Sequence, residues 1–81
     1  MVYSISDLAI EAGLSYDTVY YYIREGLIKE SGFIGTRQRI FDAAELRKLR
    51  LIVQLRREGK SIESIISIFK EEDANVHSEH L

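Results

Sequence analysis

Glycines and helix-capping residues occur at short intervals along this chain of 81 residues, which contains no proline. The segments between them are long enough mainly for short helices. Ser4 and Asp7 have the spacing of a capping box, in which each side chain satisfies a backbone N–H that the first helical turn leaves unpaired. Gly13 can adopt the left-handed conformation that many helix C-termini need. A helix is therefore predicted over residues 5–12.

A second helix is predicted to begin almost at once, because Ser15 is an N-cap candidate and no breaker follows before Gly26. Val19, Tyr22 and Ile23 recur at helical spacing and predict its buried stripe. Polar and aromatic side chains occupy the opposite face: Asp17, Tyr20, Tyr21 and Arg24. Two of three consecutive tyrosines are therefore expected to face outward.

Residues 27–41 alternate apolar and polar side chains around a glycine-containing middle, which predicts two short strands joined in a β-hairpin. The two ends are apolar and can lie on the core: Leu27 and Ile28, then Ile40 and Phe41. Arg37 and Arg39 recur at strand spacing, so one face of the second strand is expected to be basic.

Two further helices are predicted after the hairpin. Asp42 and Glu45 repeat the capping-box spacing and Gly59 is the next stop, so the third helix should run to Glu58. Ser61 is expected to cap the fourth. Apolar residues recur at helical spacing in both: Leu46, Leu49, Ile52, Val53 and Leu55, then Ile62, Ile65, Ile66 and Phe69. The two helices are expected to pair as an antiparallel hairpin.

Apolar periodicity stops after Lys70, which sets the expected end of the folded domain. We expect one domain over residues 1–70 and a disordered, acidic tail over residues 71–81. The fold class that follows is mainly helical, with four helices and a small two-stranded hairpin between the second and the third.

The composition suits one small folded domain, because 46% of the residues are hydrophobic. The absence of cysteine excludes disulfides and thiolate ligands. The chain does not begin with the pattern of a signal peptide, and no apolar run approaches the roughly 18 residues of a membrane span. A cytoplasmic protein with no membrane partner is expected.

The net charge of −2 hides an uneven distribution of charge along the chain. Residues 24–60 hold ten basic and five acidic side chains, a net charge of +5, whereas residues 61–81 hold one basic and five acidic side chains, a net charge of −4. Screening makes electrostatics local on a scale of about 8 to 10 Å. A segregated basic stretch can therefore bind phosphates although the whole chain is slightly acidic.

Helix, glycine turn and second helix over residues 5–25 describe a helix-turn-helix, whose second helix can enter the major groove of DNA. Many helical proteins contain such a turn without binding DNA. The hairpin that follows favours a DNA partner, because a recognition helix followed by a basic hairpin is the plan of a winged helix. The residues that make this hairpin polar and basic are Thr36, Arg37, Gln38 and Arg39.

The stretches "YSISDLAIEAGLSYDTVYYYIREGLI" and "RQRIFDAAELRKLRLIVQLRREGKSIESIISIF" resemble the DNA-binding domain of the MerR family of bacterial transcription regulators. The resemblance covers about residues 3–69 and includes the Ala-Gly-Leu-Ser turn and the Arg-x-Phe-Asp exit from the hairpin. It implies a winged helix-turn-helix that binds promoter DNA as a dimer. The recognition helix would lie in the major groove and the wing against the flanking backbone or minor groove.

Two residues depart from the family pattern. Tyr20 stands where the family usually has an arginine before the tyrosine pair, and Ile23 stands where it often has a glutamate. An arginine fork on guanine is the commonest specific base contact, and it is missing at this position. The Tyr20 hydroxyl can instead contact a phosphate or a sugar, which positions the protein without choosing a base.

The candidate DNA-binding residues lie on the second helix and the hairpin. Contacts to base edges are expected from the N-terminal end of the helix. Contacts to phosphates are expected from the rest of the helix and from the wing. The predicted site comprises Tyr16, Asp17, Thr18, Tyr20, Tyr21, Arg24, Lys29, Thr36, Arg37, Gln38 and Arg39. Two alternatives stay open: Asp17 can simply complement the helix dipole, and the tyrosines can cover the hairpin.

No cofactor and no metal site are expected, since His77 and His80 stand in the predicted tail without a second ligand cluster. An enzyme is disfavoured, because the sequence offers no paired nucleophile and base and no phosphate-cradling glycine loop. The resemblance further implies a dimerisation helix and an effector domain after the fourth helix. Either this chain is the N-terminal part of a longer regulator, or a one-domain member that dimerises otherwise or assembles on DNA.

Two other functions stay open at this point. An excisionase-like architectural factor would use the same winged fold to bend DNA at phased sites. A protein-interaction module would use the tyrosine-rich helix as its contact surface, because interfaces favour tyrosine and arginine.

Overall fold

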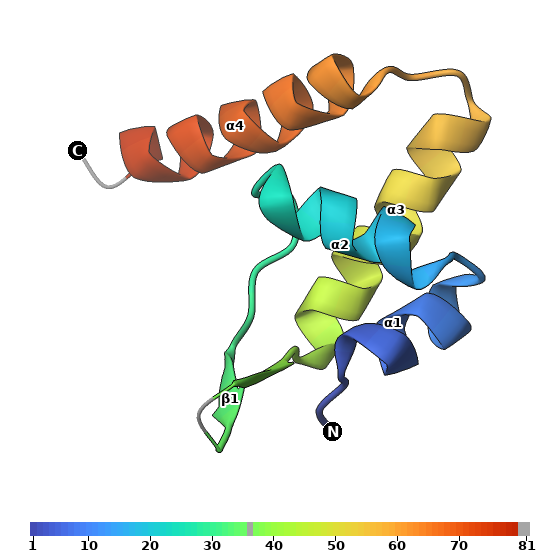
Figure 1. Cartoon of the computed structure of the whole chain (residues 1–81). Coiled ribbons are helices and arrows are strands. Elements are labelled where there is room, and N and C mark those ends of the chain that lie inside the picture. The colour runs from blue at the N-terminus through green and yellow to red at the C-terminus, as the bar shows by residue number, and fades with distance from the viewer. Residues whose placement is uncertain (36, 80–81) are drawn as a thin grey trace.

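The structure is a computed structural model that describes residues 1–35 and 37–79, with side chains as far as residue 72. Four helices and one antiparallel hairpin follow one another in the predicted order (Figure 1). The elements are α1 (Ile5–Ala12), α2 (Tyr16–Arg24), β1 (Gly32–Ile34), β2 (Gln38–Ile40), α3 (Ala43–Arg57) and α4 (Ile62–Glu79). The predicted fold class, mainly helical with a wing between the second and third helices, is confirmed.

Local capping fixes the ends of α1 as predicted. The Asp7 N–H donates to Ser4 Oγ and the Ser4 N–H donates to Asp7 Oδ2, both at 3.0 Å, so the capping box is complete. Gly13 ends the helix with φ 69°, a backbone angle that side chains rarely tolerate. The turn into α2 is therefore held by contacts within a few residues on either side.

α2 begins where the serine cap predicts and buries the stripe that its spacing predicts. The Thr18 N–H donates to Ser15 Oγ at 3.1 Å. Val19 and Tyr22 are buried, and Ile23 packs half-buried against the core. Burial of this stripe sets which face of α2 points to solvent, because the remaining side chains of a helix must follow the buried ones around the axis.

The hairpin, which we call the wing, projects from the body of helices (Figure 1). Its base is tied to the N-terminus of the chain: Tyr3 and Phe41 exchange backbone N–H···O bonds of 2.8 Å in each direction. Leu27, Ile28 and Phe41 are buried as predicted, while Ile40 is half-buried. The apolar ends of residues 27–41 therefore anchor the wing in the core.

α3 begins at its predicted cap, but the predicted capping box is only half formed. The Glu45 N–H donates to Asp42 Oδ1 at 3.1 Å. The Glu45 carboxylate does not return the bond to Asp42: its Oε1 accepts from the Lys29 N–H at 2.8 Å and its Oε2 lies 3.1 Å from Lys48 Nζ. Glu45 does not complete the capping box because the segment that leads into the wing offers a part-buried N–H with no strand partner, and Lys48 binds the second oxygen.

The core lies among α1, α2, α3 and the base of the wing, and α4 adds Ile65 to it. Ser61 caps α4 as predicted, since its Oγ accepts from the Ser64 N–H at 3.1 Å. The chain turns back after Gly59, and α4 crosses the other helices with its C-terminal end projecting from the body (Figure 1). The α3–α4 pair is therefore more splayed than a close antiparallel hairpin.

The structure continues α4 through residues 71–79 to Glu79, where the sequence analysis expects a disordered tail, and the domain boundary at residue 70 stays a prediction. Loss of apolar periodicity removes a reason to pack but does not break hydrogen bonds along a helix. No glycine or proline follows Lys60, and Glu71, Glu72 and Ala74 are good helix formers. The last two residues of the predicted tail, 80–81, lie outside the described residues.

In the described part of the chain, no helix is both long enough and apolar enough to cross a membrane. The same residues contain no group of three or more His, Asp or Glu side chains placed to hold a metal ion. The predicted absence of a site at His77 and His80 concerns side chains outside those that the structure describes.

Candidate nucleic-acid interface

The outward face of α2 carries a stripe of side chains at four-residue spacing. Tyr16, Tyr20 and Arg24 are all exposed and follow one another along this face. Asp17 and Tyr21 form the neighbouring row, and both are also exposed. The outward position predicted for Tyr20 and Tyr21 is confirmed, so an external partner can reach both hydroxyls.

The two outward tyrosines have different surroundings. The ring of Tyr21 lies 5.8 Å from that of its buried neighbour Tyr22, at an interplanar angle of 55°. The ring of Tyr20 instead meets the wing, where the guanidinium carbon of Arg39 stands 5.8 Å from its centre. This distance is within the range of a cation–π interaction. Tyr20 therefore connects the helix to the wing.

A groove runs between α2, the wing and the first turn of α1, and we call it the helix–wing groove. It has a volume of about 350 Å³ and opens to solvent. It is lined by Ser4, Ile5, Ser6, Tyr16, Tyr20, Arg37, Gln38 and Arg39. Five of the eleven predicted site residues thus meet at one surface, although the hairpin and the helix are separate in the sequence.

The guanidinium groups at the groove are available to an external anion. Among the residues that the structure describes, the ion pairs join Lys48 to Glu45 at 3.1 Å and Arg50 to Glu11 at 3.7 Å. Neither pair involves Arg37 or Arg39. Because each guanidinium carries a positive charge, the groove is positively charged where the wing meets α2.

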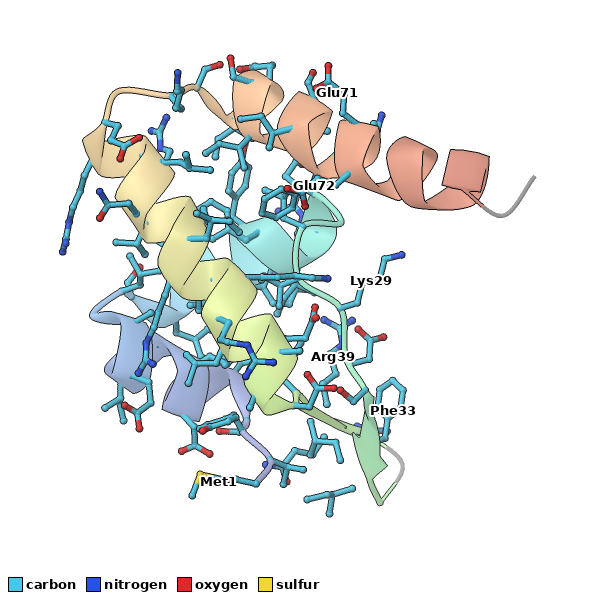
Figure 2. All side chains as sticks on the ribbon, turned by 180° about the vertical axis from the view of Figure 1, so that it is seen from behind. Met1, Lys29, Phe33, Arg39, Glu71 and Glu72 are labelled. Atoms are coloured by element: carbon cyan, nitrogen blue, oxygen red, sulfur yellow. The ribbon has the colours of Figure 1, made fainter. Side chains whose placement is uncertain are left out.

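The structure does not bring every predicted site residue to the groove. Lys29 projects away from the body, on the segment between α2 and β1 (Figure 2), and shares another depression with Leu51 and Phe69. Arg24 lies at the last turn of α2, beyond the groove. Asp17 and Tyr21 flank it without lining it. The predicted position Thr36 lies outside the described residues.

Thr18 has a structural partner for its hydroxyl. Its Oγ1 lies 2.8 Å from Ser15 Oγ, the same oxygen that caps α2. A hydroxyl can donate one hydrogen bond and accept two. Thr18 therefore retains hydrogen-bonding capacity for a ligand while it supports the cap, and it lies half-buried at the N-terminal end of the exposed stripe.

Sequence reasoning missed the contribution of α1 to the groove. Ser4 and Ser6 line it, and Ser6 is exposed in the first turn of α1. The capping box identifies this helix terminus, where first-turn N–H groups have no partner within the helix. In a helix-turn-helix the first helix crosses the DNA backbone. These two facts together could have added Ser6 to the predicted site.

Two acidic residues outside the groove, Asp42 and Glu45, connect the base of the wing to α3. The Glu45 N–H hydrogen bond lowers the pKa of the Asp42 carboxyl below its ordinary value; burial acts in the opposite direction, and the Ser31 hydroxyl adds to the lowering. Asp42 thus caps α3 and lies close to Ser31, immediately before β1. Together with the Glu45 bond to Lys29, it fixes the base of the hairpin relative to α3.

The comparisons with known proteins agree with this geometry. Residues 3–72 match the model of the MerR HTH family regulatory proteins. A transcriptional regulator of the MerR family from Bacillus cereus has a similar structure, with a TM-score of 0.79 and 21% identity over 99% of this chain. A protein assigned to MerR family transcriptional regulators from Listeria monocytogenes gives a TM-score of 0.73 and 33% identity over 95% of this chain.

A third similar structure is that of HiNmlR, a MerR family regulator lacking the sensor domain, bound to promoter DNA. Its TM-score is 0.72, with 25% identity over 98% of this chain and 73% of its own. This chain spans 63% of the Bacillus cereus protein and 62% of the Listeria monocytogenes protein. No curated protein matches the chain. Because the family model covers nearly the whole folded domain, the chain belongs to the MerR family of helix-turn-helix regulatory proteins.

Proposed function

We propose that this chain binds a specific sequence of double-stranded DNA in the regulation of transcription. Membership of a family of helix-turn-helix regulators gives the class of function. The observation that carries the proposal for this molecule is the helix–wing groove, where exposed tyrosines of α2 face two arginines of the wing. HiNmlR, which has a similar fold and is bound to promoter DNA, supports DNA as the partner.

In this proposal α2 enters the major groove, which is about 12 Å wide and admits a helix. Its N-terminal residues Tyr16, Asp17 and Thr18 reach base edges. Hydrogen bonds to base edges specify a sequence, whereas contacts to phosphates fix position and orientation. The N-terminal end of α2 is therefore the part of the chain that sets the preferred operator.

The remaining predicted contacts go to the DNA backbone. Arg37 and Arg39 on the wing bind phosphates that flank the major-groove segment, helped by Thr36 and Gln38. Arg24 extends the contact beyond the far end of α2, and Lys29 reaches a more distant phosphate. Tyr20 and Tyr21 contact phosphate or sugar through their hydroxyls. Each neutralised phosphate releases counterions, so binding is expected to weaken linearly with salt on a log–log plot.

Tyr20 has a second part in this proposal, because it holds a wing arginine beside the recognition helix. The cation–π contact with Arg39 orders a long side chain before DNA arrives. Ordering in advance lowers the entropy that binding would otherwise cost. Tyr20 thus stands where a base-contacting arginine is usual in the family. Its role here is to position Arg39, which binds a phosphate.

We further propose that the DNA-bound form is a homodimer on an inverted or direct repeat, in the bacterial cytoplasm at the nucleoid. One domain with one recognition helix covers a single half-site of the operator, and helix-turn-helix dimers bind half-sites about one helical turn apart. The repeat in the DNA would then mirror the symmetry of the protein.

Selection of bound sites from a random pool of duplex DNA tests this function. The 81-residue chain is expected to enrich a defined motif, and a symmetric or repeated motif would report the dimer. Measured affinity for the motif should fall steeply as salt rises. Recovery of no motif, together with affinity that is insensitive to salt, would contradict DNA binding and favour a protein partner for the tyrosine-rich helix.

A further inference from the structure

The outer face of α1 carries an exposed isoleucine among polar residues. The other exposed positions of this helix are Ser6, Asp7 and Glu11, whereas Ile10 is 78% exposed. The buried face of α1 is already complete without it, since Ile5, Leu8 and Ala9 face the core. Ile10 therefore contributes little to the stability of the domain, because burial and not exposure of an apolar side chain stabilises a fold.

Ile10 belongs to a larger apolar surface. The first residues of the chain run beside α1, and Met1 and Val2 are 94% and 53% exposed. An open depression of about 340 Å³ is lined by Met1, Val2, Tyr3, Asp7, Ile10 and Glu11. One exposed apolar side chain is normal on a protein surface, whereas several gathered at one place mark an interaction site. We call Met1, Val2 and Ile10 the α1 patch.

The α1 patch is separate from the proposed DNA surface. In the part of the chain that the structure describes, its depression and the helix–wing groove share no lining residue. Ser6 reaches the groove from the first turn of α1, and Ile10 lies one turn further along the helix. α1 and α4 also lie on different sides of the body (Figure 1). A molecule bound at the α1 patch would therefore leave the groove and α4 accessible.

Two opposite charges stand beside the α1 patch. Glu11 Oε2 lies 3.7 Å from Nη2 of Arg50 on α3, and the two side chains are 50% and 56% exposed. An exposed ion pair of this kind contributes little to stability, so either charge can change its partner at small cost. A two-fold interface must be complementary to itself. An apolar centre with one acid and one base beside it meets this condition, because Glu11 of each copy can meet Arg50 of the other.

We propose that two copies of this chain associate through the α1 patch in a two-fold symmetric contact. Ile10 and Val2 of each copy pack against those of the other, and the Glu11–Arg50 pair is exchanged between the copies. This surface differs from the dimerisation helix that the family resemblance implies after α4. The association itself goes beyond the proposed function, and only its consequence for DNA with two half-sites rests on that function. Two copies bound to one duplex are close together, so a weak contact acts there at a high effective concentration.

Sedimentation equilibrium of the 81-residue chain over a series of concentrations tests the association. Ile10→Asp should raise the dissociation constant of the dimer by about tenfold or more, because a two-fold interface contains the substitution twice and each new charge faces an apolar partner. Leu51→Asp is the matched control, since Leu51 is also exposed, at 45%, but lies on α3 in another depression. A wild-type chain that stays monomeric throughout, or an Ile10→Asp variant that associates like the wild type, would overturn the inference.

Charge reversal distinguishes the two-fold contact from other modes of association. Glu11→Arg places two arginines opposite each other in a dimer, and Arg50→Glu places two glutamates opposite each other, so each variant should associate more weakly than the wild type. A mixture of the two variants restores both opposite-charge pairs between unlike copies. Association should therefore be tighter in the mixture than in either variant alone. No gain on mixing would overturn the proposed arrangement.

Binding to DNA separates this inference from the proposed function. A duplex with one half-site should bind the wild type and Ile10→Asp equally, because the α1 patch lies outside the groove. A duplex with an inverted repeat of the half-site should bind the wild type cooperatively and Ile10→Asp without cooperativity. Equal cooperativity in both proteins would overturn the inference and leave DNA binding intact. Failure of both proteins to bind any duplex, with association and its recovery on mixing as expected, would overturn the proposed function and leave the α1 contact intact.

Discussion

The guanidinium of Arg39 lies over the ring of Tyr20, 5.8 Å from its centre, and this contact joins the wing to the recognition helix. One partner comes from β2 and the other from the exposed stripe of α2. In the proposed DNA-binding mode, this contact brings a positive charge to the position where the family usually has an arginine. The positive charge is supplied by the wing and held against the helix by an aromatic face.

The energy of this contact can be measured with a double-mutant cycle. We expect Tyr20→Leu and Arg39→Ala to be coupled by about 0.5–1 kcal/mol in the free energy of unfolding, the range of an exposed cation–π pair. Urea denaturation of the wild type, both single variants and the double variant gives the coupling. Strictly additive effects would show that the two side chains do not stabilise each other.

Removal of a wing arginine should weaken binding to all DNA sequences alike. Arg37→Ala is expected to reduce the salt slope by about 0.9, the value for one lost phosphate contact on duplex DNA. The matched control is Arg57→Ala, since Arg57 lies at the C-terminal end of α3, in a depression that does not include the wing. Fluorescence anisotropy at several salt concentrations measures both slopes, and an equal change in the two variants would contradict the assignment.

The N-terminal end of α2 should determine base preference. Asp17→Asn replaces an acceptor-only side chain with one that also donates, so preference at one operator position should change on the order of tenfold. Competition among duplexes that differ at single positions measures it. An unchanged preference combined with lower thermal stability would assign Asp17 to the helix dipole instead.

Glu45 should position the base of the wing. Its carboxylate accepts the part-buried N–H of Lys29, so Glu45→Ala is expected to lower the free energy of unfolding by about 1–3 kcal/mol and to speed hydrogen exchange at the Lys29 amide. Glu45→Gln keeps an accepting oxygen and should lose less. Lys48→Ala is the comparison variant: it removes the ion-pair partner of the same buried carboxylate and leaves the hydrogen bond to Lys29 in place.

Hydrogen exchange at the Lys29 amide is the most direct measurement of the role of Glu45. Exchange that stays slow in Glu45→Ala would show that another group holds this segment. Faster exchange in that variant, with DNA binding weakened more than in Lys48→Ala, would show that the orientation of the wing depends on this carboxylate.

Acid should weaken the junction between the wing and α3 through Asp42. Its pKa is lower in the folded state than in the unfolded state, mainly because the Glu45 N–H donates to the charged carboxylate. Such a group stabilises the fold fully above the unfolded pKa, about 3.9 for Asp, and the stabilisation disappears as pH falls through the folded value.

A pH series of thermal unfolding measures this effect. The melting temperature of the wild type should fall more steeply below about pH 4 than that of Asp42→Asn, because asparagine also caps helices but does not titrate. Parallel curves for the two proteins would show that Asp42 does not contribute to acid sensitivity.

Sequence reasoning succeeded where a structural choice depends on neighbours within a few residues. The capping box of Ser4 and Asp7 and the left-handed Gly13 form through local contacts, so their spacing in the sequence predicts them directly. The buried stripe of Val19 and Tyr22 follows from helical geometry in the same way. These local rules were enough to place the helices and the wing in order.

Reasoning from local patterns failed where distant segments compete for the same group. Glu45 has the right spacing to complete a capping box, but its carboxylate binds Lys29 from another segment. The end of α4 is a separate matter, because no distant segment competes there. The apolar pattern ends at Lys70 and α4 continues to Glu79, since backbone hydrogen bonds can extend a helix that has lost its buried face. Periodicity measures the need for packing and not the capacity for helix formation.

The amino-acid order by itself determined the helices, the wing and the membership of a regulator family, because these depend on short-range hydrogen bonds and on the period of apolar residues. Only the tertiary structure decided which side chains share the helix–wing groove. It brought Tyr20 to Arg39, added Ser6, and placed Lys29 in another depression. These contacts depend on how Tyr3 pairs with Phe41 and on how the buried faces pack. The spacing of residues along the chain does not determine how the wing is oriented relative to α2.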